Sequence, residues 1–500
     1  MSRVPAVRPP YRVLQVGCGP TGTSVLRGLV SRLDTVGTRL EYEVADPAVM
    51  GPGLAFSTPC DLHLLNVRAD RMSLHPQDKR EFAHWRQRNG AGHGIPSAGD
   101  DYPPRRLFGA YARWVLDDVL RTARRAGPEV RVTRERAVAV RRDGDGRWRC
   151  RFASGRVATY DRVVLALGHL PSARYAPEEG GPRFLRDPWG GLEVPADARV
   201  GVIGTRLTGV DVALALLERG HAGPVLLASR SGLLPSVKGR TAAYELAHLP
   251  GFVADQRRHG RDGGVGLETV AAVIGREVQD AEGTRRIRWS EVLHPPPSSP
   301  VTLRAGLAVA ESAGVLGRQS VLAAVVPWVP ALWRLLDEPG KQRLMSTYVG
   351  VWAVHIASFP AVSARRLLGM MDDGRLTVRP GLIGVRPSGS GYEMCFADAS
   401  PVPVDVVVNA TGPGYGRDSL LAAPLTRDLL SSRTAVAHRF GGIAVDERTF
   451  EVRGADGIVA PGLHVVGDLT RGVWLATNAV ENSVSQAAQL ADVVAGALDR

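Results

Sequence analysis

The sequence predicts an α/β protein made of two similar parallel-sheet units, with a helical segment inserted into the second. Two observations carry this prediction. A short apolar strand runs into the glycine loop Gly17–Gly22 and then into a helix, and the same order returns at Gly204–Gly209. The length supports more than one unit, because 500 residues exceed what a single hydrophobic core usually supports.

The first glycine loop has the composition of a phosphate-binding turn. The apolar run 11–16 is typical of a buried strand, and residues 23–33 have the apolar spacing of a helix. Gly17 permits a tight turn, Gly19 lets the backbone approach a pyrophosphate, and Gly22 lets helix and strand pack closely. The N-terminus of the helix would then face the negative charge of the ligand.

An acidic residue follows the second predicted strand of this unit. The strand covers residues 40–45 and ends at Asp46, whose carboxylate would accept hydrogen bonds from an adenosine ribose. Pro20 and Thr21, inside the glycine loop, complete the expected cofactor contacts. A tight strand–helix turn without a ligand is the alternative, but the flanking strand, helix and acid favour a Rossmann-like dinucleotide-binding domain.

A second unit of the same kind follows. An apolar strand ends at Gly204, the predicted helix covers residues 210–218, and the strand 225–228 ends at Ser229 and Arg230 instead of an acid. An acid would repel a ribose 2′-phosphate, whereas serine and arginine would accept one. The second unit therefore predicts NADPH in preference to NADH.

Further motifs resemble those of a large bacterial family of FAD/NAD(P)-binding proteins. The matching stretches are Gly51-Pro-Gly-Leu-Ala-Phe56, His63-Leu-Leu-Asn66-Val67, Phe82-Ala-His-Trp85, Tyr102-Pro-Pro-Arg105, Gly204-Thr-Arg206-Leu-Thr208-Gly-Val-Asp211 and Ser229-Arg-Ser-Gly-Leu-Leu-Pro235. The resemblance implies FAD in the first unit, with Asn66 near the flavin ring and Trp85 at the cofactor. It also implies that Thr208 contacts the second dinucleotide. For Asn66, a turn-capping side chain is the alternative.

Two arginines in these motifs have open roles. Arg105 precedes the predicted helix 107–121; it is a candidate catalytic residue that contacts an anion or the flavin, or else the solvated start of that helix. Arg206 stands where the family loop has its middle glycine, so its side chain should obstruct a pyrophosphate. Alternatively, its guanidinium swings out and binds phosphate. NADPH binding therefore depends on how Arg206 is accommodated.

Two strands that end in glycine mark further parts of the predicted flavin site. The strand 162–168 ends at Gly168 and resembles the strand that closes the first half of two-dinucleotide flavoproteins. The strand 405–412 ends with Thr411 and Gly412, and by the same resemblance it marks the return of the chain to the flavin domain.

A Gly-Asp pair ends the last predicted strand. In flavoproteins of this architecture, an aspartate at the position of Asp468, after Gly467, bonds the ribityl chain. The segment 478–490 is expected to form a helix that begins at Asn478 and presents its N-terminus to the flavin.

These landmarks divide the chain into two domains. The FAD-binding domain is expected to be discontinuous, covering residues 1–195 and 380–500, with a proline- and glycine-rich crossover at its first end. The NAD(P)H-binding domain covers residues 196–379 and contains a helical insertion at about 240–375.

One histidine in the insertion is a second catalytic candidate. Trp352 to His355 matches a "W-x-x-H" pattern of the family, but the basic residues that usually follow are replaced by Ile356-Ala-Ser358. His355 would act as a proton shuttle, or it is a core histidine whose hydrogen bonds are satisfied by the protein.

Composition argues against several other classes of protein. The net charge is +12, but the basic residues are scattered among acids, so nucleic-acid binding is not expected. The four cysteines, Cys18, Cys60, Cys150 and Cys395, are far apart, which argues against a metal site or a dithiol centre. No apolar run reaches about 18 residues, so we expect no membrane span and a location in the cytoplasm.

Two dinucleotide units permit hydride transfer from NADPH to FAD, which predicts an FAD-dependent oxidoreductase. The plan resembles N-hydroxylating and Baeyer–Villiger monooxygenases, but the Baeyer–Villiger "F-x-G-x-x-x-H-x-x-x-W" pattern is absent at Phe184–Trp189. Relatives of this type include aspartate N-oxygenases that form nitrosuccinate, which implies oxygen-dependent N-oxygenation of a small amine or amino acid. The alternative is a flavin- or nucleotide-binding partner or sensor protein with weak or no oxygenase activity.

Overall fold

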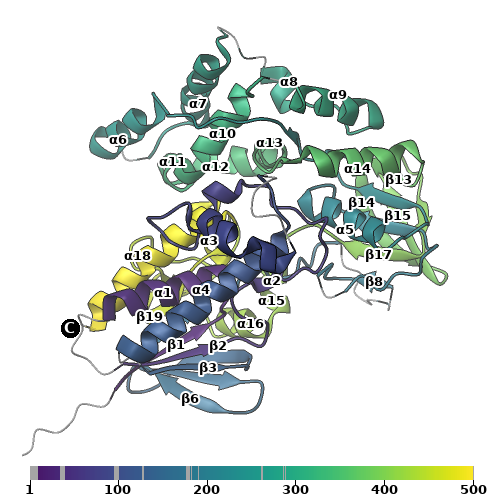
Figure 1. The fold of residues 1–500 in the computed structure, drawn as a ribbon. Helices are drawn as coiled ribbons and strands as arrows, with labels where there is room; N and C mark the ends of the chain where they lie inside the picture. Colours follow the sequence, from purple (N-terminus) through teal and green to yellow (C-terminus); the bar gives the residue numbers. More distant parts are fainter. Residues whose placement is uncertain are drawn as a thin grey trace, which may run out of the picture.

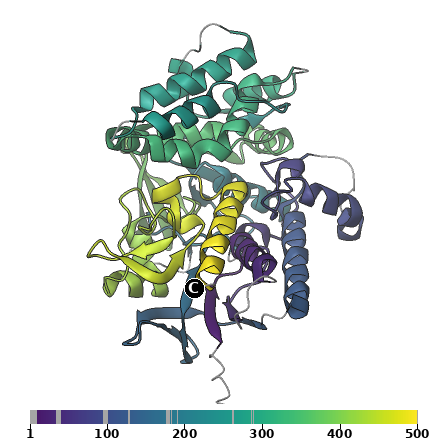
Figure 2. The same ribbon diagram turned by 90° about the vertical axis from the view of Figure 1, so that its left-hand side faces the viewer.

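The computed structural model describes residues 10–33, 40–94, 101–126, 129–175, 181, 183–189, 191–260, 263–284, 287, 289–312 and 314–498. Two α/β units lie side by side, and a layer of helices lies over both of them (Figures 1 and 2). No helix in these ranges is both long enough and apolar enough to cross a membrane.

The first unit is built on a six-stranded sheet in the order β18-β19-β7-β1-β2-β3. All neighbours are parallel except β18 and β19. Its elements before the crossover are β1 (Tyr11–Val16), α1 (Pro20–Leu33), β2 (Leu40–Ala45), α2 (Gly53–Phe56), η1 (Ala69–Arg71), α3 (Glu81–Asn89), η2 (Gly90–His93), α4 (Arg105–Ala126), β3 (Glu129–Thr133), β4 (Ala137–Arg142), β5 (Trp148–Phe152), β6 (Val157–Tyr160) and β7 (Arg162–Leu165). The central strands are mostly buried, as parallel strands covered on both faces must be.

The C-terminal part of the chain completes this unit. It contributes α15 (Arg417–Ala422), α16 (Pro424–Ser431), β18 (Glu451–Arg453), β19 (Val459–Val465), η5 (Asp468–Thr470), α17 (Arg471–Trp474) and α18 (Val480–Leu498). Helix α18 packs along α1, although the two helices are more than 400 residues apart in sequence (Figure 1). Gly28 of α1 lies against Ala491 of α18, which lets the two helices approach closely.

The second unit contains an all-parallel sheet in the order β13-β10-β9-β17-β8. Its elements are β8 (Phe184–Leu185), β9 (Val200–Ile203), α5 (Leu207–Glu218), β10 (Val225–Ala228), β11 (Val237–Lys238), β12 (Phe359–Pro360), α14 (Ala361–Asp372), β13 (Leu376–Arg379), β14 (Leu382–Ser388), β15 (Gly391–Phe396), β16 (Val402–Val404) and β17 (Val406–Asn409). The short strands β11 and β12 pair with each other outside this sheet.

The two units repeat one order of elements. In each, a strand, a glycine loop, a helix and a second strand come first. A further helix and strand and a three-stranded antiparallel meander (β4-β5-β6 or β14-β15-β16) then follow. The chain then returns beside the first strand, as β7 beside β1 and as β17 beside β9. The predicted α/β fold of two Rossmann-like units is therefore confirmed.

One expected domain boundary is wrong. The strand that ends at Thr411 and Gly412 was expected to mark the return to the flavin domain, near residue 380. Instead, β17 pairs with β9 in the second sheet, so the second unit continues through Gly412. The physical reason is the repeated order, because each unit needs its own closing strand beside its first strand.

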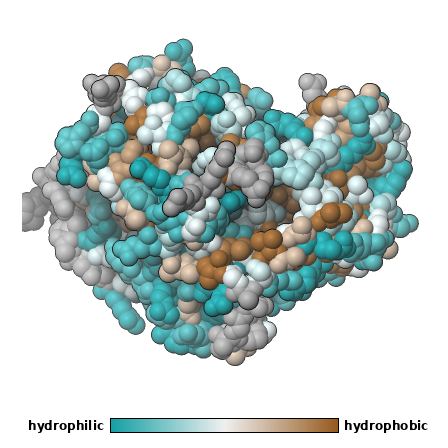
Figure 3. Space-filling view, turned by 90° about the horizontal axis from the view of Figure 1, so that it is seen from above, coloured by the Kyte–Doolittle hydropathy of each residue, from teal (hydrophilic) through white to brown (hydrophobic). Residues whose placement is uncertain are grey.

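The helical insertion lies between β11 and β12 and contains α6 (Leu249–His259), α7 (Leu267–Glu282), α8 (Trp289–Leu293), α9 (Pro300–Ala310), α10 (Gly317–Val325), η3 (Val326–Trp328), α11 (Val329–Leu335), α12 (Glu338–Arg343), η4 (Leu344–Tyr348) and α13 (Val349–Ile356). It has a hydrophobic core of its own, which also includes Phe440 and Leu475 from the first unit. Figure 3, which looks down on this layer, shows apolar side chains gathered in patches on a mainly hydrophilic face.

The two crossings between the units lie side by side. Pro171 on the first crossing and Pro413 on the second form a β-bridge, and the Gly414 amide donates to the Leu170 carbonyl at 2.7 Å. The buried Asn409 side chain donates to two carbonyls of the first crossing, at 3.2 and 3.1 Å. The two segments that connect the units are therefore held to each other by hydrogen bonds.

Candidate functional site

The first glycine loop requires glycine at its two ends for steric reasons. Gly17 has φ +95°, and a Cβ there would lie less than 3.0 Å from the Ala166 carbonyl of the neighbouring strand end. A Cβ at Gly22 would lie equally close to the Gly17 carbonyl oxygen. The Gln15 side-chain amide donates to the carbonyls of Gly17 and Gly22, at 2.9 and 3.1 Å, and holds the turn.

The middle of this loop faces more open space. A Cβ at Gly19 would meet only the Gly53 backbone, at 3.3 Å. Helix α1 begins at Pro20, three residues earlier than predicted, as suits a proline at the first helical position. Thr21 faces Gly467, whose Cβ position would lie 3.2 Å from the Thr21 methyl group. The predicted residues Gly19, Pro20, Thr21 and Gly467 thus lie together.

Asp46 lies beside the same loop. Its carboxylate accepts hydrogen bonds from the Cys18 amide at 2.7 Å and the Ala48 amide at 2.9 Å. The side chain therefore fixes the loop to the end of β2. A carboxylate has about four acceptor positions, so lone pairs remain for the hydroxyls of a ribose.

Asp468 is the centre of a buried polar cluster. Its Oδ1 accepts hydrogen bonds from the Tyr415 hydroxyl at 3.0 Å and the Thr477 hydroxyl at 3.3 Å. Burial raises the pKa of the Asp468 carboxyl, and this effect outweighs the nearby His169, which lowers the pKa. His169 Nε2 lies 3.2 Å from Oδ2, yet Oδ2 is buried and accepts no hydrogen bond from any described residue.

These features fit the FAD that the sequence predicts. The unused Oδ2 of Asp468 is the acceptor that a ribityl hydroxyl requires. Gly168, next to His169, has φ +64° and open space at its Cβ position. Two neighbouring strand ends, those of β7 and β19, thus bring Gly168 and Asp468 to the edge of the sheet where the glycine loop also lies.

Asn66 and Trp85 differ in what they can offer a cofactor. Asn66 is half-buried, and its backbone carbonyl accepts a hydrogen bond from Lys238 Nζ at 2.7 Å. Its predicted place near the flavin stays a prediction. Trp85 is only 2% exposed and packs against Phe82 and Tyr111. Trp85 belongs to the aromatic core and has no surface for a cofactor, so that expectation is corrected.

Arg105 joins the two units. Its guanidinium donates to the Asp211 carboxylate at 2.6 Å and to the Leu64 carbonyl at 3.1 Å, and both ionic side chains are buried. His63 bonds the Asp211 carbonyl at 2.8 Å on the same contact. This arrangement corrects the expectation of a solvated helix start, because the guanidinium is buried and held by the Asp211 carboxylate. Its predicted contact with the flavin or with an anionic ligand stays a prediction.

The second glycine loop repeats the steric requirements of the first. Gly204 has φ +126°, and a Cβ there would lie less than 3.0 Å from the Ala410 carbonyl at the end of β17. A Cβ at Gly209 would meet the Gly204 carbonyl in the same way. Helix α5 begins at Leu207, so Thr208 lies in its first turn. No hydrogen bond is found for the Thr208 side chain among the residues described.

Arg206 occupies the middle position of this second loop. Its guanidinium donates to the Gly350 carbonyl of α13 at 2.8 Å, and its buried Nη1 has no hydrogen-bond partner within the described ranges. Burial lowers the pKa of Arg206 to about 10. The side chain therefore extends from the loop to the insertion, and it carries an unused donor that phosphate could accept.

Ser229 and Arg230 follow β10 as predicted. The Ser229 hydroxyl is already engaged, with the Thr205 hydroxyl at 2.9 Å and the Gly232 amide at 2.9 Å. Arg230 is exposed, and its guanidinium has no partner in the part of the chain that the structure describes. Arg230 is therefore the better placed of the two for a ribose 2′-phosphate.

Thr411 and Gly412 belong to the second loop and not to the flavin site. Gly412 has φ +82° with open space at its Cβ position, the same condition as Gly168 in the first unit. The Thr411 hydroxyl donates to the Asn409 side chain at 2.7 Å. Both residues follow the strand beside Gly204, so they do not mark the return to the flavin domain, and their contact with a cofactor stays a prediction.

The hydrogen bonds of His355 bear on its two alternative roles. Its Nδ1 lies 3.3 Å from the Ser236 hydroxyl and its Nε2 lies 3.0 Å from the Val292 carbonyl. Burial lowers the pKa of His355, with Arg318 and Arg206 adding to this effect. Both ring nitrogens of His355 are thus engaged within the protein, which favours the structural role, while its role as a proton shuttle stays a prediction.

Asn478 is exposed and precedes α18, which begins two residues later at Val480. No hydrogen bond of its side chain is found among the described residues. Its expected cofactor contact remains a prediction.

Several residues of the site were not predicted. Tyr415, Thr477 and His169 surround Asp468, and only the Gly168–His169 pair carried a signal in the sequence. Lys238 from β11 is half-buried and reaches the Asn66 loop of the other unit. Burial, together with the charge of Arg71, lowers the pKa of Lys238 to about 8. No pattern in the sequence connects Lys238 with Asn66.

Comparison with known proteins supports the first unit most strongly. Residues 15–170 match the model of a family described as FAD-NAD(P)-binding. A nitrosuccinic acid synthase from Aspergillus oryzae is 34% identical over 168 residues. That match covers 31% of this chain and 26% of the relative's length.

Solved structures share the fold over nearly the whole chain. The ornithine N-hydroxylase of Kutzneria sp. 744 has a TM-score of 0.52 at 14% identity, covering 96% of this chain and 98% of that one. A cadaverine monooxygenase from Erwinia amylovora, bound to FAD, has a TM-score of 0.51 at 11% identity over 98% of this chain and 95% of that one. The bacillithiol disulfide reductase of Bacillus cereus has a TM-score of 0.50 at 14% identity, over 98% and 100%. At these identities the likeness shows a shared two-unit fold.

Proposed function

We propose that this protein is an FAD-dependent oxidoreductase that uses NADPH and oxygen to oxygenate a small amine or amino acid at nitrogen. In such a reaction, NADPH supplies two electrons, one oxygen atom enters an N–H bond, and the other leaves as water. FAD, when bound, accepts the hydride and activates oxygen. The single observation that carries the proposal is the repeated glycine-loop geometry, which provides two dinucleotide sites in one chain.

The first site has the groups that an FAD molecule needs. Gly19 and the start of α1 offer open backbone amides to the pyrophosphate, and Asp46 offers acceptors to the adenosine ribose. Asp468, held by Tyr415 and Thr477, offers an acceptor to the ribityl chain. The chain thus binds and orients the cofactor and does not need a classical acid–base pair.

The described cysteines support an oxygenase over a dithiol reductase, although one structural neighbour is a disulfide reductase. All four cysteines are free, and three of them are buried. Burial raises the pKa of Cys18 and of Cys60 to about 12, which keeps both thiols protonated. A disulfide substrate would need a reactive thiolate in most such mechanisms.

Amine chemistry is supported by the relatives. The relative from Aspergillus oryzae is a nitrosuccinic acid synthase, and two structural neighbours are an ornithine N-hydroxylase and a cadaverine monooxygenase. In this chain, Lys238 and Arg71 bring positive charge to the Asn66 loop, which suits a substrate with a carboxylate. We therefore place amino acids ahead of simple amines in the proposal.

The proposal is tested with the FAD-loaded full chain. NADPH oxidation and oxygen consumption are measured with a panel of aspartate, ornithine, lysine and cadaverine, and products are identified by mass. We expect at least one amine to stimulate both rates and to gain one or more oxygen atoms. Retained FAD that NADPH cannot reduce would overturn the proposal.

A second candidate function is a flavin- or nucleotide-binding partner or sensor protein. The position of Arg206 favours it, because the side chain leaves the second loop and is held by the insertion. The same assay separates the two functions. A sensor would bind FAD tightly but would show no substrate-dependent oxygen consumption.

A further inference from the structure

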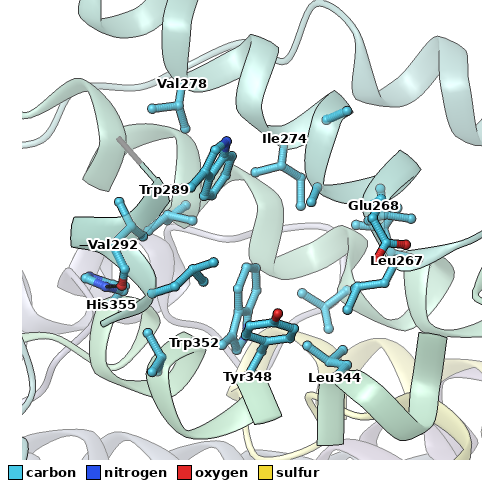
Figure 4. A pocket seen from close by; sticks show the side chains of 18 of the residues that line it. Leu267, Glu268, Ile274, Val278, Trp289, Val292, Leu344, Tyr348, Trp352 and His355 are labelled. Atoms are coloured by element: carbon cyan, nitrogen blue, oxygen red, sulfur yellow. Dashed lines mark hydrogen bonds between the residues drawn. The ribbon is translucent and has the colours of Figure 1, made fainter. Parts of the chain in front are cut away.

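A cavity of about 440 Å³ lies inside the helical insertion. Its walls come from α7, α8, α10, α11, η4 and α13 (Figure 4). One lining residue, Leu475, belongs to the first unit and lies on the segment that follows Asp468. A volume of this size is typical of small-molecule sites, so the cavity is large enough for a ligand of its own.

Aromatic side chains provide much of the lining. Trp289, Trp333, Trp352 and Tyr348 all border the space. Figure 4 shows Trp289 at one side of it and Trp352 with Tyr348 at the other. Trp289 is 40% exposed. This exposure is unusual because an indole is more stable when another ring covers it.

No unpaired charge faces this cavity from the described residues. Arg343 pairs with Glu268, and Arg318 lies 3.4 Å from Glu282. His355 is engaged at both ring nitrogens. An ionised ligand would therefore lose its hydration and meet only charges that already have a counter-ion within the protein, which is unfavourable in an apolar site.

Two polar atoms are nevertheless available for a neutral ligand. Arg318 Nε is buried and donates to no described residue. The Tyr348 hydroxyl likewise has no hydrogen-bond partner in the described ranges. Arg318 Nε would suit one acceptor oxygen of the ligand, and the Tyr348 hydroxyl could donate to it as well.

The wall of the cavity also has irregular backbone. Residues 344–348 form a π-helical turn, a feature that often marks functional sites. Leu475 has φ +59°, a strained conformation for a branched side chain. Leu344 and Tyr348 of this turn, and Leu475 itself, all line the cavity.

We propose that this cavity is a binding site for a neutral, flat, mainly apolar molecule that carries one acceptor oxygen. The aromatic walls favour a flat, apolar molecule, and the paired charges favour a neutral one. The unused donors favour one acceptor oxygen. None of the lining residues belongs to either glycine loop, so the binding test does not depend on the proposed reaction.

The test uses a matched pair of probes with the FAD-loaded full chain. 2-Acetonaphthone is neutral and 2-naphthoate is anionic, while the two have nearly the same shape. Isothermal titration calorimetry should show saturable one-site binding of 2-acetonaphthone and binding of 2-naphthoate weaker by roughly tenfold or more. Equal binding of both probes, or no saturable binding of 2-acetonaphthone, would overturn the proposal.

Variants locate the binding. Ala271→Phe fills the cavity from α7 and should weaken 2-acetonaphthone binding by roughly tenfold, while Ala305→Phe on the exposed face of α9 should leave it unchanged. Trp289→Ala, which removes a half-exposed ring, should weaken it as well, with the exposed Val301→Ala as its control. Unchanged affinity in both cavity variants would place the probe elsewhere and contradict the assignment.

Discussion

The two glycine loops of this chain share two glycines and differ at the position between them. Gly17 and Gly204 both approach the carbonyl of the neighbouring closing strand, and the third glycine of each loop, Gly22 or Gly209, approaches the carbonyl of the first. The middle position is Gly19 in the first loop and Arg206 in the second. The outer glycines are thus required by the fold, and only the middle one is free to change with the ligand.

This comparison predicts that the outer glycines are equally intolerant of a side chain. Gly17→Ala and Gly204→Ala each force a Cβ onto a carbonyl at a positive φ, which should cost about 3 kcal/mol or more. Thermal melts with flavin content as a second readout check this. Gly17→Ala should lose FAD, whereas Gly204→Ala should keep it. Equal FAD loss in both variants would mean that the two units do not fold as separate sites.

The contact between the units gives the next largest effect. Arg105→Met leaves Asp211 buried without its partner and should destabilise the protein by about 3 kcal/mol. Adding Asp211→Asn removes the buried charge and should restore part of that stability. The measurement is the thermal midpoint of both variants, together with the rate of flavin reduction by NADPH. If NADPH still cannot reduce the flavin of the stabilised double variant, Arg105 acts in catalysis and its structural assignment is wrong.

Lys238, which reaches from the second unit to Asn66, predicts a dependence on pH. Burial lowers the pKa of Lys238 to about 8 from an ordinary value of 10.5, so the unfolded chain binds a proton in this window that the folded chain does not. The stability of the wild type should therefore rise between about pH 8 and pH 10.5 relative to Lys238→Met.

Partial solvent access should limit the effect of Lys238 on the free energy of unfolding to about 2 kcal/mol. Urea denaturation at pH 7.5 and pH 10 measures it, with the exposed Lys79→Met as the control. Below pH 8, Lys238→Met should be the more stable protein, and the difference should shrink at pH 10. A constant difference across this range would show that Lys238 is not desolvated.

The sequence predicts the glycine loops and the strand ends well because their requirements are local. Gly17, Gly168 and Gly467 each have a positive φ at the end of a strand, which glycine adopts without strain. The sheet that contains β17 could not be predicted in the same way. Both units close with a similar apolar strand, and only the pairing with β9 distinguishes them.

Other features depend on residues that are far apart in sequence. The sequence does not show that Asp211 is the partner of Arg105, because the two residues are 106 positions apart. Arg105 was therefore interpreted as a possible contact for a bound anion. Trp85 appeared as a cofactor contact because a motif does not show that Phe82 and Tyr111 enclose the ring. The cavity of the insertion was missed because helical spacing identifies buried faces and does not show where they fail to meet.

Flavin reduction by NADPH in the absence of oxygen tests the central claim most directly, namely that the second loop keeps its fold and that Arg206, in place of the middle glycine, obstructs the dinucleotide as the sequence predicts. Stopped-flow absorbance of wild type, Arg206→Lys and Arg206→Gly gives the NADPH concentration that half-saturates flavin bleaching. We expect this concentration to fall roughly tenfold in Arg206→Gly, and to stay near the wild-type value in Arg206→Lys. Half-saturation of the wild type at micromolar NADPH, with weaker binding in Arg206→Gly, would contradict the claim and make Arg206 a phosphate ligand.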